Sequence, residues 1–198
     1  MKAQESHTQV SIFTVGHSTH SLDDFIALLR AYGIERLVDV RTIPRSRHNP
    51  QFNCDTLGKF LRNRRIGYRQ MKELGGLRHS RADSLNAGWH NASFRGFADY
   101  MQTPEFAAAV AKLIDLAREK STAIMCAEAV PWRCHRSLIG DALVIRGVEV
   151  RDIFSSKITK PHVLKAMAMV RGNTVTYPAQ EADKSNMSGL LWTEKRKE

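Results

Sequence analysis

The sequence alternates short apolar runs with longer segments in which apolar residues recur at helical spacing. Runs such as "SIFTV" and "RLVDV" are rich in β-branched residues and end at a glycine or a charged residue, which is typical of buried strands. The pattern predicts five strands, at residues 11–15, 36–40, 66–71, 122–128 and 148–154.

Between these runs, apolar side chains fall three or four positions apart, as on one face of a helix. In "SLDDFIALLRAYG" the helix is expected to begin at Ser21, where Asp24 forms a capping-box-like start, and to end at Gly33. Residues 77–93 have no period and predict a long loop, a kind of segment that often forms lids or binding loops. The same helical spacing predicts further helices at 55–65, 94–101, 104–117, 134–147 and 161–170.

This succession of strands and helices predicts an α/β fold, a single domain in which a mainly parallel sheet of about five strands carries helices on both faces. The domain is expected to span residues 11–176, after a flexible N-terminus at 1–10. Residues 177–198 are expected to form a polar tail with the basic run "KRK" near its end, either disordered or docked through its one apolar cluster, Leu190, Leu191 and Trp192.

The predicted fold points to one edge of the sheet as the functional site. In parallel sheets, ligands bind in the crevice outside the carboxyl ends of the strands. Three predicted strands end in residues that can carry chemistry, namely Gly16 to Ser18, Asp39 to Arg41 and Cys126 to Glu128. We therefore expect these residues to converge.

Charge narrows the class of ligand. The chain of 198 residues has a formal net charge of +10, and eleven Arg or Lys against two acidic residues between Arg41 and Arg81 account for +9 of it. A concentrated positive field attracts phosphorylated small molecules and polyanions, so the expected partner is an anionic ligand, either a nucleotide or nucleic acid. The residues expected to contact nucleic acid are Arg62, Arg64, Arg65 and Tyr68.

Composition also bears on location. No apolar run approaches the length of a membrane span, and the N-terminal "MKAQESHTQVS" lacks the apolar core of a secretory signal. The three cysteines are sparse, and an odd number cannot all pair, so they are a poor disulfide framework. These features predict a cytoplasmic protein without a membrane partner.

The loop after the first strand offers both an acid/base group and anion ligands. Gly16 would let backbone approach a ligand closely, and Ser18 adds a hydroxyl beside the free N–H groups of the next helix. His17 is a candidate general acid or base because imidazole titrates near neutral pH. The alternative is a loop histidine satisfied by backbone.

The segment "DVRTIPRSR" predicts an anion-binding loop. Asp39 is expected to hold Arg41 through a bidentate pair, which leaves Arg45 and Ser46 for a phosphate or carboxylate. An internal salt bridge that only fixes the loop is the alternative, since charges at a buried strand end need partners.

The segment "CAEAVPWRCHR", residues 126–136, is the richest in reactive groups. Cys134 and His135 lie near a helix N-terminus, which lowers the pKa of a thiol, and Cys126 is placed to resolve a reactive Cys134 as a disulfide. Glu128 is a candidate general base or ligand clamp, and Arg133 and Arg136 are expected to grip the substrate. The catalytic candidates are thus Glu128, His17, Cys126, Cys134 and His135.

Two other interpretations of this segment are weaker. A tetrahedral metal set could come from Cys126, Cys134, His135 and His17, but no C-x-x-C pair accompanies them, so the sequence predicts no metal and identifies no cofactor. A phosphatase loop would need C-x5-R, whereas Cys126 to Arg133 is one residue longer.

The ordered set "TVGHS", "DVRTIPRS", "LGG", "FADYM", "CAE" and "CHR" resembles a widespread bacterial family known as domain of unknown function 488. The resemblance covers about residues 11–155 and implies one common site without naming an activity. The positions that match the family motifs are His17, Asp39, Arg41, Ser46, Cys126, Glu128, Cys134, His135 and Arg136.

A second resemblance, at the level of the fold, is to rhodanese-type sulfurtransferases. It rests on "LVDVR" and on the position of Cys126 at the end of a strand that leads into a helix. The Gly-rich anion cradle that persulfide chemistry uses is missing after Cys126.

Three functions fit these features. The first is an enzyme that acts on an anionic, nucleotide or nucleic-acid-related substrate at the strand ends. The second is a nucleic-acid-binding module without chemistry, and the third is a thiol redox or sulfur-transfer protein. The enzyme ranks first, because a binding surface needs no acid, base and thiol groups gathered at strand ends.

Overall fold

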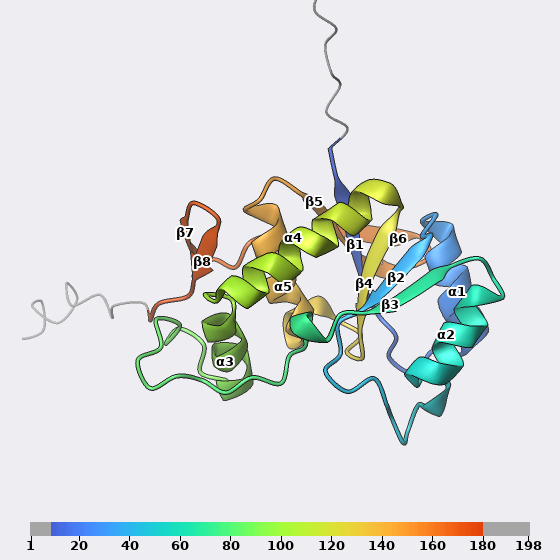
Figure 1. Cartoon of the computed structure of the whole chain (residues 1–198), viewed down its shortest axis with the longest axis horizontal. Helices are drawn as coiled ribbons and strands as arrows, with labels where there is room; N and C mark the ends of the chain where they lie inside the picture. Colours follow the sequence, from blue (N-terminus) through green and yellow to red (C-terminus); the bar gives the residue numbers. More distant parts are fainter. Residues whose placement is uncertain (1–8, 180–198) are drawn as a thin grey trace, which may run out of the picture.

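The structure, a computed structural model, describes residues 9–179, and a six-stranded sheet forms its centre (Figure 1). The strand order is β3-β2-β4-β1-β5-β6, in which β6 is antiparallel to β5 and all other pairs are parallel. All five predicted strands are present. The strands of this sheet are β1 (Ser11–Gly16), β2 (Arg36–Asp39), β3 (Gly67–Gln70), β4 (Thr122–Cys126), β5 (Glu149–Ser155) and β6 (Ile158–Pro161).

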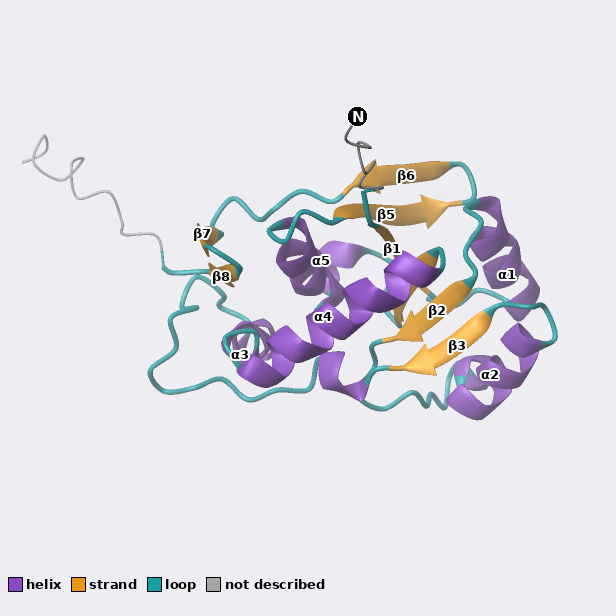
Figure 2. Cartoon of the chain, turned by 45° about the horizontal axis from the view of Figure 1, so that its top comes forward, coloured by secondary structure: helices purple, strands orange, loops and turns teal. Residues whose placement is uncertain are grey.

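Helices cover both faces of this sheet, as predicted (Figure 2). One apolar cluster packs α1 and α2 against one face, and a second packs α4 and α5, with α3 beside them, against the other. The helices are α1 (Leu22–Ala31), α2 (Cys54–Arg62), α3 (Ala92–Tyr100), α4 (Pro104–Glu119) and α5 (Arg136–Val144). Short 3-10 turns occupy Pro50–Phe52, Lys72–Leu74 and Pro131–Arg133.

Local sequence explains where these elements begin and which way their side chains point. Ser21 is the N-cap of α1, and its hydroxyl accepts a hydrogen bond from the backbone N–H of Asp24, as the capping pattern predicted. Side chains alternate along β4, so that Ala123 and Met125 join the α1–α2 core while Ile124 and Cys126 join the α4–α5 core. Alternation therefore sets the face on which the Cys126 thiol lies.

The central strands β1 and β4 end side by side, and the chain leaves them in opposite directions. Gly16 is paired with Cys126 at their carboxyl ends. After β1 the chain forms α1 on one face, whereas after β4 it forms α5 on the other face (Figures 1 and 2). Such a switch point opens a crevice between the two departing loops.

The predicted helix at 161–170 is wrong. Residues 158–161 form β6 on the free edge of β5, and the backbone N–H of His162 still donates to the carbonyl of Val150. Beyond it, β7 (Met169–Arg171) and β8 (Thr174–Thr176) form a separate hairpin. Edge pairing and the buried contacts of His162 override the helical spacing of this segment.

The C-terminal end of the described chain is held in the core. Tyr177 is fully buried, and its backbone N–H donates to the side-chain oxygen of Asn86 at 2.9 Å. Among residues 9–179, no helix combines the length and the apolar character that a membrane crossing requires. The trio predicted to dock the tail, Leu190, Leu191 and Trp192, lies outside the described residues.

A buried charge cluster joins α5, β5 and the segment after β6. His162 contacts Asp141 through Nε2 and Asp152 through Nδ1, both at 2.9 Å, and Gly140 of α5 lies against its ring. Thr14 donates to the second oxygen of Asp152, and Tyr177 donates to that of Asp141. Burial alone lowers the pKa of His162, but the hydrogen bonds to the two carboxylates outweigh it and raise the pKa from 6.5 to about 9. The histidine is therefore a buried cation between two anions.

This cluster predicts a pH dependence of stability. Because the pKa of His162 is higher in the folded state, its contribution is complete below pH 6.5 and is lost as the pH rises through about 9. We expect the free energy of unfolding to fall over this window by at most about 1.4 kcal/mol per pH unit. Urea denaturation at several pH values would measure the slope.

The matched variant is His162→Gln, which keeps hydrogen-bonding groups but cannot titrate. It should be less stable than the wild type below pH 6.5, and the difference between the two proteins should shrink toward pH 9. A difference that stays constant across the window would show that His162 is not charged in the folded protein.

Candidate functional site

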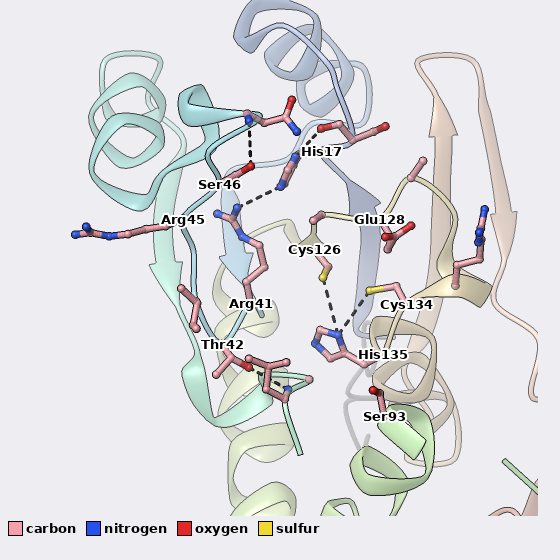
Figure 3. Close-up of a pocket in the computed structure, with 18 of the residues that line it drawn as sticks. His17, Arg41, Thr42, Arg45, Ser46, Ser93, Cys126, Glu128, Cys134 and His135 are labelled. Carbon is pink, nitrogen blue, oxygen red and sulfur yellow. Dashed lines mark hydrogen bonds between the residues drawn. The ribbon is translucent and has the colours of Figure 1, made fainter. Parts of the chain in front are cut away.

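The crevice at the switch point is a cavity of about 660 Å³ (Figure 3). Its walls come from the loops after β1, β2 and β4, from Gly76 and Leu77 beyond the 3-10 turn at 72–74, and from the first turn of α3. Ten of the residues predicted to form the site line it, namely His17, Ser18, Arg41, Arg45, Ser46, Cys126, Glu128, Arg133, Cys134 and His135. Most of the residues predicted for the site therefore lie around one cavity at the carboxyl ends of the strands.

Close backbone packing joins the loops after β1 and β4. The N–H groups of His17 and Ser18 donate to the carbonyls of Cys126 and Ala127 at 3.0 and 2.9 Å. A Cβ atom at Gly16 would lie 1.9 Å from the carbonyl oxygen of Glu128, so only glycine fits there. Gly16 was expected to let backbone approach a ligand, and instead it lets one loop of the site approach the other.

Arg136 is placed differently from its prediction as a substrate-binding residue. Its side chain is fully buried and lies outside the cavity lining. Its Nη1 donates to the carbonyl of Glu128, and its Nη2 donates to the carbonyl of Ala129 at 2.8 Å. Arg136 therefore holds the loop after β4 from behind, because its donors point to backbone and not to the cavity.

The predicted pair of Asp39 and Arg41 is present and is bidentate. Nε and Nη2 of Arg41 donate to the two carboxylate oxygens at 2.8 and 2.5 Å, and Nη2 also donates to the carbonyl of Phe52. Tyr68 donates its hydroxyl proton to Asp39 at 2.7 Å, and burial raises the pKa of Tyr68. The buried carboxylate is thus saturated with donors, which fixes the direction of Arg41.

His17 is held in one tautomer by this network. Its Nε2 lies 3.2 Å from Nη1 of Arg41, which can only donate, so Nε2 accepts and the proton is on Nδ1. Nδ1 then donates to the carbonyl of Ser18 at 2.9 Å, and the ring stacks on Phe52. Burial lowers the pKa of His17, and the charge of Arg41 lowers it further. With its lone pair occupied, the imidazole positions Arg41 and is poorly placed for the predicted acid/base role.

Two thiols and one imidazole meet at the base of the cavity (Figure 3). The Nδ1 atom of His135 lies 3.6 Å from Sγ of Cys134 and 3.9 Å from Sγ of Cys126. On its other side, Nε2 of His135 lies 3.0 Å from the carbonyl of Val40, and a Cβ atom at Gly76 would strike the ring at 2.6 Å. Strand β2 and the loop after β3 therefore fix the orientation of the imidazole toward the sulfurs.

The order of acidity within the thiol pair is the reverse of the predicted one. A hydrogen bond from Cys134 lowers the pKa of Cys126 well below its ordinary value. The same bond, together with burial, raises the pKa of Cys134. Cys134 precedes the start of α5 as predicted, but its role as donor to Cys126 outweighs the helix terminus.

The remaining walls carry exposed polar groups. Arg45 and Arg133 are exposed at the rim, and the only ion pair of Arg45 in the described chain is a 3.9 Å contact with exposed Asp55. Glu128 is exposed on the loop above the thiols and faces the same cavity. Sequence analysis missed Thr42 and Ser93, although Thr42 directly follows Arg41 and Ser93 ends the loop expected to bind a ligand.

The basic segment divides between two edges of the sheet. Arg41 and Arg45 lie at the carboxyl edge, whereas Arg62 to Arg65 lie where α2 ends and β3 begins, at the opposite edge. Arg64 stacks on Phe60 and pairs with Asp23, and the hydroxyl of Tyr68 is bound to Asp39. The residues predicted to contact nucleic acid are therefore not part of the cavity.

The fold and the site together define an α/β protein with a thiol-containing pocket at the carboxyl edge of a mainly parallel sheet. A family model described as domain of unknown function DUF488 matches residues 21–143, more than half of the chain. The chain belongs to this family, which confirms the resemblance that its motifs carry. Comparisons of this chain with the curated proteins and with the solved structures found no match.

The position of Arg136 predicts a large effect on stability. Arg136→Met should lower the free energy of unfolding by about 2–6 kcal/mol, because the carbonyls of Glu128 and Ala129 each lose a donor and each unsatisfied buried group costs about 1–3 kcal/mol. Urea denaturation at neutral pH would measure the loss.

Arg133→Met is the matched control, because Arg133 lies three positions before Arg136 in the sequence but is exposed. Its stability should stay within about 0.5 kcal/mol of the wild type. Equal losses in the two variants would mean that Arg136 does not hold the loop.

Proposed function

We propose that this protein is an enzyme that binds a small anionic substrate in the cavity and acts on it with the group formed by Cys126, Cys134 and His135. One observation carries the proposal: a single cavity has these reactive groups at its base and the exposed guanidinium groups of Arg45 and Arg133 at its rim. Convergent polar groups in a concave site at the strand ends are the usual mark of a catalytic pocket.

The cations around the cavity define the substrate class. Arg41 keeps one N–H of Nη1 without a partner among the described residues, and its other side-chain donors are held by Asp39, Phe52 and His17. Arg45 and Arg133 at the rim are free to fold over a phosphate or carboxylate. A volume of about 660 Å³ suits a ligand of nucleotide size, which favours a small molecule over a nucleic-acid duplex.

The residues divide into distinct roles under this proposal. Cys126, Cys134 and His135 supply the reacting group, and Glu128 is the acid/base residue, because it is exposed to the cavity with its carboxylate free of protein partners in the described chain. Ser18 and Ser46 line the anion subsite. His17 positions Arg41 and does not itself transfer protons.

A nucleic-acid-binding module is the second function that the basic segment suggested. It would need one continuous positive track, whereas Arg41 and Arg45 follow β2 and Arg62 and Arg65 precede β3, at opposite ends of these two parallel strands. The geometry therefore favours the cavity over the segment as the place where the anion binds.

Two double variants separate these functions, and each removes two positive charges from exposed positions. We expect Arg45→Ala with Arg133→Ala to weaken binding of a nucleoside monophosphate by at least about tenfold, the effect of losing about 1.4 kcal/mol. Arg62→Ala with Arg65→Ala should change the affinity by less than about twofold. Isothermal titration calorimetry at low salt, with inorganic phosphate as a second probe, would measure both.

The opposite ranking would contradict the proposal. If the Arg62/Arg65 variant lost binding and the Arg45/Arg133 variant kept it, the anion site would lie at the amino edge of the sheet. Absence of binding by the wild type to both probes would count against a phosphate-bearing substrate.

A further inference from the structure

We propose that Cys126, Cys134 and His135 bind one zinc ion whose fourth coordination position opens into the cavity. The inference deepens the proposed function, because it identifies the reactive group of that site. Its catalytic part rests on the proposed function, whereas metal binding does not. Within the described chain, the ligand atoms of these three residues all lie within 4.8 Å of one another.

The distances between ligand atoms fit a tetrahedral centre. With Zn–S of about 2.3 Å and Zn–N of about 2.0–2.1 Å, tetrahedral geometry places a sulfur and a nitrogen about 3.6 Å apart. The Nδ1 atom of His135 is 3.6 Å from the sulfur of Cys134 and 3.9 Å from that of Cys126. Both nitrogen–sulfur distances therefore lie within a few tenths of an ångström of the tetrahedral value, and the two sulfurs lie within 4.8 Å of each other.

The imidazole is already in the tautomer that a metal needs. A backbone carbonyl only accepts, so the 3.0 Å contact between Val40 and Nε2 of His135 places the proton on Nε2. The lone pair of Nδ1 then faces the two sulfurs. A carbonyl behind a ligating histidine is the usual outer partner at metal sites, because it fixes the ring and raises its basicity.

Two sulfurs facing one nitrogen favour a metal over a simple Cys–His pair. A general base activates one thiol, whereas here Cys126 and Cys134 lie at similar distances from the same lone pair. Two thiolates balance the charge of a divalent ion, so the buried centre carries no net charge. Thiolate and imidazole ligands select zinc over magnesium or calcium, which prefer oxygen.

The set has three protein ligands and not four. His17, which the sequence offered as a fourth, has its Nε2 directed to Arg41, and the positive guanidinium next to it disfavours a second cation. Three ligands from the protein leave one position for water or substrate, as in catalytic zinc sites. The cavity and the carboxylate of Glu128 lie on this open side.

The test uses the full-length protein, reduced and freed of metal with a chelator. Cobalt(II) added to the wild type should bind at one ion per chain and give the intense visible bands of a tetrahedral centre and a thiolate-to-cobalt charge-transfer band. Zinc should displace the cobalt and abolish these bands. Cys126→Ser, Cys134→Ser and His135→Gln should each weaken zinc binding by at least about 100-fold, since even outer partners of a metal contribute 10–100-fold.

Cys54→Ser is the matched control, because Cys54 lies at the start of α2 and lines none of the cavity. It should keep both the stoichiometry and the spectrum. Near-ultraviolet circular dichroism checks that each variant is folded. A measurement on the wild type alone guards against misfolded variants: zinc should slow alkylation of Cys126 and Cys134 and leave Cys54 unaffected.

Several results would overturn the inference. They are a wild type that binds neither cobalt nor zinc at micromolar concentration, a spectrum without a thiolate band, and zinc binding that survives loss of a proposed ligand or disappears in Cys54→Ser. A Cys126–Cys134 disulfide that forms equally fast with and without zinc would also overturn it. Zinc binding without anion binding would leave the inference intact and refute the proposed function, and the reverse result would refute only the zinc site.

Discussion

One buried positive charge supports both halves of the site. The guanidinium of Arg136 has no access to water, and it donates to the carbonyls of Glu128 and Ala129 while its charge acts on Asp152. In the low dielectric of the interior these interactions are strong, and the loss of any partner is costly. The loop that follows Cys126 and the helix that follows His135 are thus joined through a single side chain.

The arginines of this protein differ in function because they differ in burial. Arg136 is sealed in the core and holds backbone, Arg41 is clamped by Asp39 with one donor left over, and Arg45 and Arg133 stand in solvent at the rim. A buried guanidinium must be hydrogen-bonded within the protein, so the donors of Arg136 are directed to the backbone and cannot reach a ligand. The exposed arginines and the one free donor of Arg41 remain available to a ligand, and net charge alone could not separate these groups.

Much of the fold could be predicted from the sequence, because apolar periodicity reports burial directly. The rule that ligands bind at the carboxyl ends of parallel strands placed His17, Arg41, Cys126 and Glu128 together, and all four line the cavity. Hydrogen bonds between residues far apart in the chain could not be predicted, whereas the local pair of Asp39 and Arg41 could. Tyr68 and Asp39 are one example, and the segment after β6, where His162 is fixed by Asp141 and Asp152, is another.

The strand order has a consequence for how the chain folds. β1 is synthesised before the other strands of its sheet, yet both of its neighbours come late, since Ile12 pairs with Thr122 on one side and with Val150 on the other. Until β4 and β5 have left the ribosome, the backbone N–H and C=O groups along the edges of β1 have no native partner. Pairings of such large sequence separation slow folding and expose the nascent chain to aggregation. The strand order that places β1 beside β4, and so forms the crevice, therefore means that the sheet cannot be completed until β5 has been synthesised.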